Sequence, residues 1–460
     1  MKRIYLDYAA TTPVDPRVFS AMRPYFSEKF GNPGSVHRSG QEAIAALDGA
    51  REKIAKVIDA KFGEIIFTAS VTEANNLVLR GMVKIFGTSR ATTFQNRSSH
   101  RSSGDERSAL SAENPAQGGN LAFLPPRASS KWSSLDPKIF VPRVIVSGIE
   151  HESILETAKD LEKDGVEVIY LPVNQEGMVD LKKLKAALNE RTVLVSIMYA
   201  NNEVGTIQPI AEIAEMIEKL QNSKNHDRNN LTILQSFNHQ FPLFHTDASQ
   251  AFQYLNCDVN TLGVDLMTLS SHKIYGPKGA GALYIRGKKL MTNNYQLMTM
   301  MTGGGQEYGL RSGTENVPAI VGFGKAVELL TEYAKEPKRI GELRDYFWAR
   351  LKKIKPRTEI NGSVIHYNKR EGTSPASRLP NNLNVYFPDS SSEKMLVKLD
   401  MLGIEASAGS ACAARSLNES YILRALGYGE RRAKSSIRFS LGRQTTKGKI
   451  DEALGRMKNI

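Results

Sequence analysis

The sequence predicts an α/β protein in which a mostly parallel β-sheet lies between two layers of helices. Short segments rich in β-branched residues alternate with segments of helical periodicity along most of the chain. The short segments are mainly apolar, as is typical of strands that are buried on both faces. We expect strands at residues 64–68, 143–147, 166–171, 192–197 and 281–285, and the run 264–269 is a further apolar segment.

Helical patterns fill the intervals between these strands, at residues 153–163, 181–188 and 210–220. From about residue 320 the pattern changes. We expect long helices at 317–335 and 339–354, then a strand at 382–387 and a helix at 393–402. This predicts a large domain over residues 15–320. A smaller α/β domain would combine residues 1–14 with 321–460.

Three stretches lack sustained periodicity and are rich in polar residues and proline. They span residues 88–142, 221–243 and 363–380. We interpret all three as surface insertions or mobile loops.

The composition of the 460 residues is that of a globular protein, with 41% apolar and 24% charged residues. Two cysteines are too few for a disulfide framework or an all-cysteine metal site, and no metal is expected. No apolar stretch approaches the length of a membrane span, and the first residues do not resemble a signal peptide. We therefore expect a cytoplasmic protein without membrane contact.

The net charge of +13 suits an acidic partner or nucleic acid. We favour the simpler interpretation, a solvated basic surface or a generally basic proteome. Because the sequence contains no zinc knuckle or RNA-binding signature, we expect no direct nucleic-acid binding.

The first candidate for chemistry is Lys273, in the segment Ser270–Lys273 directly after the apolar run 264–269. A lysine in a partly desolvated pocket has a lowered pKa and attacks an aldehyde to form a Schiff base. Ser270 and His272 beside it suit a cofactor phosphate. A lone lysine after a strand is more often a surface residue.

The second candidate is Asp247, with Gln250 three residues later. Pyridoxal phosphate (PLP) acts as an electron sink while its ring nitrogen stays protonated, and a buried aspartate maintains that proton. Gln250 suits the phenolate oxygen of the ring. The alternative is that Asp247 caps an ordinary turn.

Two further candidates lie at predicted helix starts. Thr72 opens a helix after the strand 64–68, where free N–H groups suit a phosphate, although it also suits an ordinary cap. His151 opens the helix 153–163 and suits ring stacking and proton transfer near neutral pH.

The last candidates are Cys412 and Arg438. Cys412 lies among small residues, as a mobile nucleophile requires, whereas Cys257 follows Tyr254-Leu255-Asn256 and resembles a buried structural cysteine. Arg438 lies in a strand-like segment and suits a bidentate contact with a substrate carboxylate.

Together, these motifs resemble the cysteine desulfurases of the NifS/IscS type, within the fold-type I, class V aminotransferase-like PLP enzymes. The resemblance spans nearly the whole chain except the three insertions. Besides the segments around Cys412 and Arg438, it includes residues 5–13 (YLDYAATTP), 31–37 (GNPGSVH), 198–205 (MYANNEVG), 270–281 (SSHKIYGPKGAG), 303–307 (GGGQE) and 311–314 (RSGT).

The resemblance implies a role for each candidate. Lys273, His151 and Cys412 would be catalytic, with Lys273 bound to PLP and Cys412 forming a persulfide. Arg438 and Asn202 would contact the substrate carboxylate. The remaining cofactor contacts would come from Asp247, Gln250, Thr72, Ser270, His272, Asn202, His151 and Thr314, the last reaching the phosphate of a neighbouring subunit.

Several positions depart from the usual family pattern. Ser70 and Val71 stand where glycine and a small residue are common, so the phosphate site would be reshaped. Tyr199, Gln306, Tyr308 and Ala408 also differ from frequent family residues. None removes a group that the chemistry requires.

The resemblance further implies a seven-stranded sheet and a homodimer. The expected reaction converts L-cysteine to L-alanine, with sulfur passed from Cys412 to acceptor proteins such as an iron–sulfur scaffold or a tRNA-thiolation carrier. A selenocysteine lyase or another class V PLP lyase is the alternative enzyme. A role mainly as an assembly partner is less consistent with the intact Lys273, Asp247 and Cys412.

Overall fold

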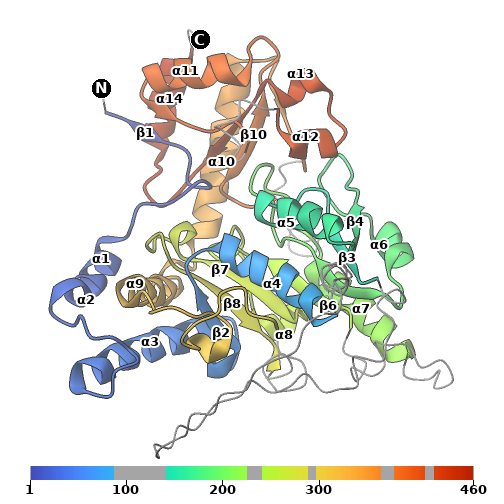
Figure 1. The fold of residues 1–460 in the computed structure, drawn as a ribbon. Coiled ribbons are helices and arrows are strands. Elements are labelled where there is room, and N and C mark those ends of the chain that lie inside the picture. Colours follow the sequence, from blue (N-terminus) through green and yellow to red (C-terminus); the bar gives the residue numbers. More distant parts are fainter. Residues whose placement is uncertain are drawn as a thin grey trace, which may run out of the picture.

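The computed structural model describes residues 2–86, 141–224, 241–287, 297–363, 378–409 and 419–458. Its centre is a seven-stranded sheet with the order β2-β8-β7-β6-β5-β3-β4 (Figure 1). The strands are β2 (Ile65–Thr68), β3 (Arg143–Ser147), β4 (Glu167–Leu171), β5 (Thr192–Ser196), β6 (Leu243–Asp247), β7 (Leu266–Ser270) and β8 (Gly281–Ile285). Within this sheet, β8 alone runs antiparallel to its neighbours. The predicted mostly parallel sheet of seven strands is confirmed.

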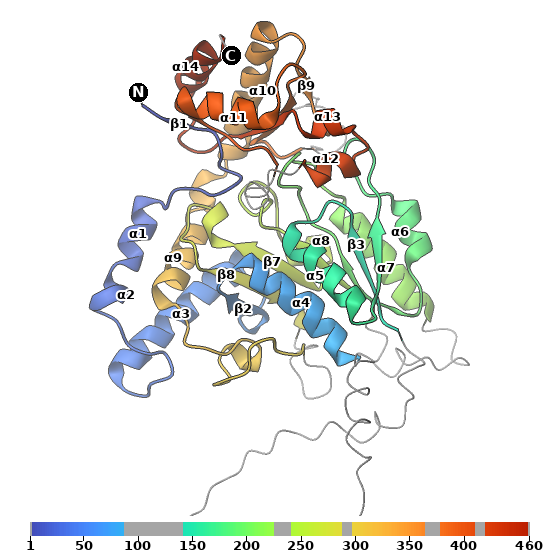
Figure 2. The same cartoon turned by 45° about the horizontal axis from the view of Figure 1, so that its top comes forward.

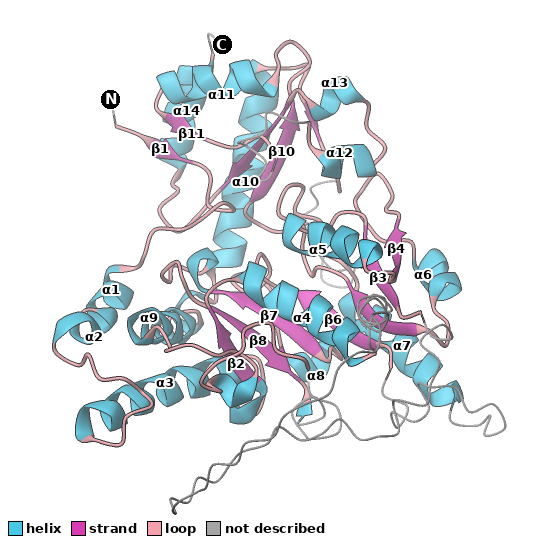
Figure 3. Ribbon diagram, viewed as in Figure 1, coloured by secondary structure: helices cyan, strands magenta, loops and turns pink. Residues whose placement is uncertain are grey.

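Helices cover both faces of the sheet, because successive strand residues point to opposite sides (Figure 3). Ile65 and Phe67 face one core, for example, and Ile66 faces the other. The first core includes α1 (Pro16–Met22), α3 (Arg38–Val57), α6 (Leu181–Ala187), α7 (Ile210–Lys224), α8 (Val259–Leu262) and α9 (Val317–Glu328). The second includes α4 (Val71–Ile85) and α5 (Glu152–Lys163).

A second group of elements lies at the upper end of the molecule in Figure 1. It contains a three-stranded antiparallel sheet and a two-stranded parallel one. The strands are β9 (Glu359–Ile360), β10 (Asn382–Tyr386) and β12 (Ser436–Ser440), then β1 (Ile4–Tyr5) and β11 (Ile404–Glu405). The helices are α10 (Glu336–Ile354), α11 (Ser392–Met401), α12 (Tyr421–Ala425), α13 (Glu430–Ala433) and α14 (Lys447–Met457).

These elements share a hydrophobic core that is separate from those of the large sheet. Ile4 and Leu6 from the first residues pack in it with side chains from Ile340 to Met457. The two ends of the described chain therefore lie in the same part of the molecule (Figures 1 and 2). None of the described helices combines the length and the apolar character needed to cross a membrane.

Two expected helix boundaries were wrong, namely the end of the helix predicted at 317–335 and the start of the helix predicted at 339–354. The helix predicted at 317–335 ends at Glu328, a short 3-10 turn η8 (Thr331–Tyr333) follows, and α10 begins with Pro337 in its first turn. Proline is tolerated there because the first N–H groups of a helix have no intrahelical partner, so it marks a helix start.

The stretch 221–243 was predicted to be an irregular insertion, but both of its ends belong to regular elements. Residues 221–224 complete α7, and Leu243 begins β6. The insertion predicted at 363–380 likewise ends in ordered structure, because buried Arg378 donates to the carbonyls of Asn361 and Ser363. Residues 88–140, 225–240 and 364–377 lie outside the described residues.

Candidate active site

A cavity of about 190 Å³ lies at the carboxyl ends of the parallel strands. Asp247 ends β6 and Ser270 ends β7, while His151 and Met198 follow β3 and β5 within a few residues. Carboxyl ends of parallel strands meet at one edge of a sheet, which is where open α/β folds bind ligands. Among its lining residues are nine of the predicted site residues: Lys273, His151, Asp247, Gln250, Thr72, Ser270, His272, Asn202 and Arg438.

Two predicted site residues are not part of this cavity lining. Thr314 is exposed elsewhere on the chain. Cys412 lies outside the described residues. The other cysteine, Cys257, is buried in the core of the large sheet, and burial raises the pKa of its thiol to about 12, as its predicted structural role requires.

Lys273 is held inside the cavity by the N-terminal segment of the chain. It ends the 3-10 turn η5 (Ser271–Lys273), which follows β7 directly. Its Nζ donates to the carbonyls of Ala9 at 2.5 Å and Ala10 at 2.7 Å. Gln250 Nε2 donates to the same Ala9 carbonyl at 3.0 Å. Lys273 is therefore not an ordinary surface lysine.

Asp247 is buried and hydrogen-bonded on both carboxylate oxygens. Oδ2 accepts from Asn75 Nδ2 at 2.9 Å, and Oδ1 accepts from the Ser249 N–H at 2.9 Å. Asn75 Nδ2 also donates to Ser153 Oγ at 2.8 Å, and Ser153 Oγ lies 3.0 Å from His151 Nδ1. Asp247 thus belongs to a polar network that reaches His151, which a simple turn cap would not require.

Asn75 was not among the predicted site residues. Residues three apart lie on the same face of a helix. The spacing of Thr72 and Asn75 in α4 was therefore the available signal. Its contact with Asp247 spans 172 residues of chain and depends on the folded sheet.

The histidines at the cavity are neutral at neutral pH. His151 caps α5, and its Nδ1 accepts from the Ser153 N–H at 3.1 Å, so the imidazole proton resides on Nε2. Burial lowers the pKa of His151 below its ordinary value. For His272, burial and the neighbouring Lys273 and Lys278 lower the pKa to about 3.

The N-terminus of α4 lines one side of the cavity and favours an anion there. Ser70 caps the helix by accepting from the Glu73 N–H at 3.1 Å, and the Glu73 carboxylate accepts from the Ala69 N–H at 2.8 Å. This reciprocal arrangement is similar to a capping box. The cap is supplied by Ser70 and not by Thr72, which lines the cavity. A helix N-terminus with hydroxyls nearby is a favourable phosphate site.

Arg438 is fully buried between two protein acceptors. Its Nη2 donates to Asp7 Oδ1 at 2.8 Å and its Nη1 to the Asn202 carbonyl at 3.0 Å. Each Nη carries a second hydrogen, and Nε has no partner among the described residues. Asp7 was not among the predicted site residues, although it holds the predicted arginine.

The cavity lining fits PLP. Four of its buried polar atoms lack a partner among the described residues, namely Ser270 Oγ, Ser249 Oγ, Asn202 Oδ1 and Arg438 Nε. Buried polar atoms are normally satisfied, so such a group indicates a ligand. The helix N-terminus suits a phosphate, the Asp247 carboxylate suits a protonated ring nitrogen, and the Lys273 amine suits an aldehyde.

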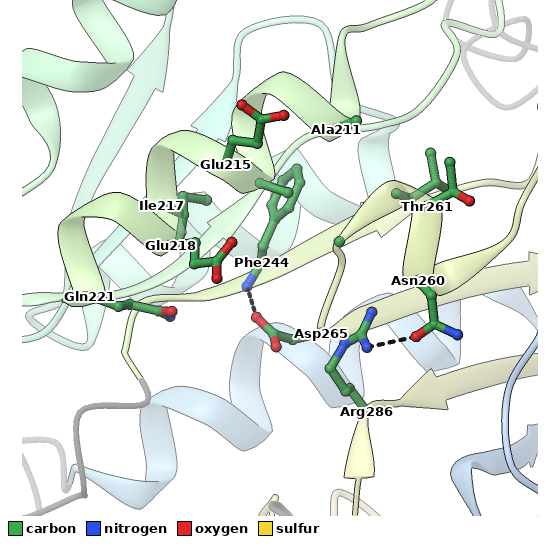
Figure 4. Close-up of a pocket in the computed structure, with 13 residues that line it drawn as sticks. Ala211, Glu215, Ile217, Glu218, Gln221, Phe244, Asn260, Thr261, Asp265 and Arg286 are labelled. Atoms are coloured by element: carbon green, nitrogen blue, oxygen red, sulfur yellow. Dashed lines mark hydrogen bonds between the residues drawn. The ribbon is translucent and has the colours of Figure 1, made fainter.

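A second cavity, of about 450 Å³, lies at the amino ends of β6 and β7 (Figure 4). Asp265 there accepts from the Phe244 N–H at 2.9 Å, and Arg286 Nη1 donates to Asn260 Oδ1 at 3.0 Å. None of the predicted site residues lines this cavity.

Comparison with known proteins identifies the family. The chain matches the family described as aminotransferase class-V over residues 4–98, 141–225 and 231–453. A cysteine desulfurase IscS of Dictyoglomus turgidum is 39% identical over the whole chain and 95% of its own length. A mitosomal cysteine desulfurase of Trachipleistophora hominis is 38% identical over 98% of this chain and 84% of its own length.

Solved structures agree. A NifS-like protein superposes with a TM-score of 0.74 at 31% identity, covering 100% of this chain and 99% of that one. A NifS-like protein of Rickettsia africae gives 0.71 at 29% identity and 99% coverage of each chain. These comparisons confirm the resemblance that the motifs predicted and do not favour the lyase alternative. The chain belongs to the class-V aminotransferase family and, within it, to the PLP-dependent cysteine desulfurases of the IscS/NifS type.

Proposed function

We propose that this protein removes sulfur from L-cysteine, releasing L-alanine, and that Cys412 takes up the sulfur as a persulfide. The observation that carries this proposal is the single cavity in which Lys273 and the Asp247 network meet. Membership of the cysteine desulfurases over the full length of the chain supports it.

PLP, when bound, supplies an electron sink for negative charge at the substrate α-carbon. The residues of this chain supply orientation and proton transfer. The Asp247 carboxylate, oriented by Asn75 and the Ser249 N–H, holds a proton on the ring nitrogen of the cofactor. The Lys273 amine takes the proton from the substrate α-carbon, and neutral His151 exchanges a proton at Nε2.

Substrate recognition is assigned to Arg438 and Asn202. Both would contact the substrate carboxylate, for which the remaining Arg438 hydrogens are suitable donors. The Cys412 thiolate then attacks the substrate sulfur. A sulfur–sulfur bond forms as the carbon–sulfur bond breaks, and the released carbon skeleton gains a proton to become alanine.

We infer a homodimer in which Thr314 of each subunit contacts the phosphate of the other. The exposed position of Thr314 supports this role. Large apolar side chains are also exposed in two segments, 14–36 and 298–308, as is typical of a protein interface. They are Val14, Phe19, Phe26, Phe30, Val36, Met298, Met300, Met301 and Tyr308. Light scattering should give twice the chain mass of 50.9 kDa.

We further propose two domains, a large one around the seven-stranded sheet and a small one around the separate core near α10 and α14. The separate cores support this division. Sulfur would pass from Cys412 to acceptors such as an iron–sulfur scaffold or a tRNA-thiolation carrier. We place this activity in the cytoplasm.

The test compares Cys412→Ala with Cys257→Ala. Both variants should keep the visible absorbance of bound PLP. Cys412→Ala should lose sulfide release and alanine formation from L-cysteine, and Cys257→Ala should retain both, because that thiol is buried in the core. Wild-type turnover by Cys412→Ala would show that the assigned nucleophile is wrong.

A further inference from the structure

An uncommon backbone conformation lies two residues after Lys273. Tyr275 has a φ of 68°, in the left-handed region that bulky residues rarely occupy. Its side chain is buried, and 3% of the residue is exposed. A bulky residue keeps a left-handed backbone only where its surroundings hold it there, and such residues cluster at functional sites. The contacts of Tyr275 therefore bear on how Lys273 is held.

The backbone of Tyr275 is bonded on both sides to the N-terminal segment of the chain. Its N–H donates to Thr12 Oγ1 at 2.8 Å, and its carbonyl accepts from the Asp15 N–H at 3.0 Å. Thr12 Oγ1 donates in turn to the His272 carbonyl at 3.0 Å. The residues on either side of Lys273 are thus joined to the same segment whose carbonyls accept from the lysine amine.

The side chain of Tyr275 packs against Arg443, which follows β12. The guanidinium carbon of Arg443 lies 4.1 Å from the centre of the Tyr275 ring and 3.6 Å from the centre of the Tyr333 ring. The Arg443 backbone N–H also donates to the Tyr275 hydroxyl at 2.6 Å. Cation–π contacts are stronger where the cation is desolvated, and 9% of the Arg443 side chain is exposed. Arg443 therefore makes a strong contact with the Tyr275 ring.

The Arg443 guanidinium is held by aromatic rings and charge and not by hydrogen bonds. None of its three nitrogens has a hydrogen-bond partner among the described residues, and Nη1 lies 3.6 Å from Asp15 Oδ2. Burying donors without hydrogen bonds costs stability. An apolar side chain would fill this position at lower cost, so the arrangement favours a role in holding Tyr275 over a purely stabilising one.

The backbone at Arg443 is fixed from α10. Arg339 Nη2 donates to the Arg443 carbonyl at 3.0 Å, and its Nη1 donates to the Thr445 carbonyl at 2.9 Å. Glu336 accepts from Arg339 Nη2 at 2.8 Å and so orients the guanidinium that makes these contacts. The Tyr275 ring therefore packs on a fixed point outside the large sheet.

We propose that Arg443 is a positioning residue for Lys273. By packing on the Tyr275 ring, it holds the left-handed backbone of Tyr275 and, through it, the turn η5 that directs the Lys273 amine into the cavity. Arg443 is not among the residues that line the cavity, so it acts through Tyr275 and not by contact with cofactor or substrate. This inference rests on the proposed function, because that function gives the PLP aldehyde to Lys273.

The test uses the holoenzyme of the wild type and of Arg443→Gln, Tyr275→Gly and the two substitutions combined. Glycine adopts a left-handed backbone without strain, so Tyr275→Gly removes the ring without blocking that conformation. Three properties are measured: the rate at which diluted holoenzyme loses PLP, followed by absorbance, kcat and KM for L-cysteine, and the melting temperature.

Arg432→Gln is the matched control. The Arg432 guanidinium also contacts two tyrosine rings, with its carbon 4.2 Å from the Tyr428 ring centre and 5.1 Å from that of Tyr386. Its side chain donates to residues 359–361, none of which lines the cavity. The control therefore removes the same kind of contact away from Lys273.

We expect Arg443→Gln to lose PLP about tenfold faster than the wild type and to lower kcat by a similar factor, as loss of a desolvated cation–π contact predicts. KM should stay unchanged because the substrate contacts remain. Tyr275→Gly should lose PLP at least as fast, and adding Arg443→Gln to it should produce no further change, because the ring is already absent. Arg432→Gln should lower only the melting temperature.

Arg443→Lys covers the case in which Arg443→Gln does not fold. Lysine keeps the charge but not the planar contact with two rings, so PLP loss and kcat should lie between those of the wild type and those expected for Arg443→Gln. Wild-type values in a folded Arg443→Lys and a folded Arg443→Gln would overturn the inference.

Two further outcomes would also contradict it. Equal effects in Arg432→Gln would assign the changes to stability, and a full additional loss on adding Arg443→Gln to Tyr275→Gly would mean that Arg443 acts without Tyr275. Failure of the proposed function is distinguishable. In that case borohydride reduction and peptide mapping of the wild type would place PLP on another lysine, or the wild type would form no alanine from L-cysteine.

Discussion

The two ends of the central sheet each carry a cavity, and they differ in how their polar atoms are paired. At the amino ends, the larger cavity is lined by groups bonded within the protein, such as Asp265 to the Phe244 N–H and Arg286 to Asn260 (Figure 4). At the carboxyl ends, the smaller cavity has four buried polar atoms without a partner among the described residues. The two cavities therefore differ in their unsatisfied buried groups as well as in volume, and such groups favour the smaller one as the ligand site.

The largest effect should come from Lys273→Ala at the carboxyl end. Loss of the amine should abolish the absorbance of covalently bound PLP and lower alanine formation by about 10²–10⁴-fold, the usual contribution of a catalytic acid or base. Lys278→Ala, at an exposed position nearby, is the control and should behave as wild type. Persistence of the absorbance band in Lys273→Ala would assign the cofactor to another lysine.

Asn75→Ala tests whether the network around Asp247 matters to catalysis. The substitution removes one hydrogen bond from a buried carboxylate, and we expect kcat to fall about tenfold while PLP remains bound. Asn76→Ala is the control, because Asn76 is only half-buried and its side chain bonds within the same helix, to the Thr72 carbonyl and to Arg80. An equal fall in kcat in the two variants would mean that the effect comes from a less stable α4 and not from the Asp247 network.

Arg286→Gln tests the amino end. The guanidinium donates to two backbone carbonyls, of Val264 and Val259, and to Asn260. We expect a loss of about 1–3 kcal/mol in the free energy of unfolding, with kcat and KM of the folded enzyme unchanged. If kcat of the folded variant also fell, the larger cavity would take part in catalysis, and the contrast between a structural cavity and a ligand site would be wrong.

Glu150→Gln should produce the smallest effect on activity and should be visible only in how stability varies with pH. Burial raises the pKa of Glu150 from its ordinary 4.5 to about 8. The folded protein therefore retains a proton that the unfolded chain has lost between these pH values. Stability of the wild type should fall as pH rises through this window.

Because glutamine resembles the protonated acid in shape, the variant should lose this dependence. Its melting temperature should match the wild type near pH 4.5 and exceed it near pH 9. Parallel curves for the two proteins across that range would mean that Glu150 is ionised in the folded state.

The sequence predicted the parts of the site that depend on strand order. Ser270 and His151 follow expected strands, so a parallel sheet brings them to one edge without further information. The strand that ends at Asp247 was not among the expected ones. The supporting residues depend on contacts that only the folded chain creates. Asn75 meets Asp247 across 172 residues, and Asp7 meets Arg438 across 431.

Other features had no signal in the sequence. The reversed direction of β8 does not follow from an apolar run, because both directions bury the same side chains. The helix boundary near Glu328 was obscured by continuous helical periodicity up to residue 335. The roles of Cys412 and Thr314 stay predictions.

The pairing of the first residues with the last has a consequence for biosynthesis. Asp7 bonds to Arg438, the Ala9 N–H donates to Ser440 Oγ, and the Ala9 and Ala10 carbonyls bind Lys273. Residues 7–10 are therefore synthesised long before residues 438–440, and the cavity is complete only when both are present. We therefore expect the cofactor to bind only after β12 has been synthesised. A nascent chain halted before β12 would contain Lys273 but not the completed cavity.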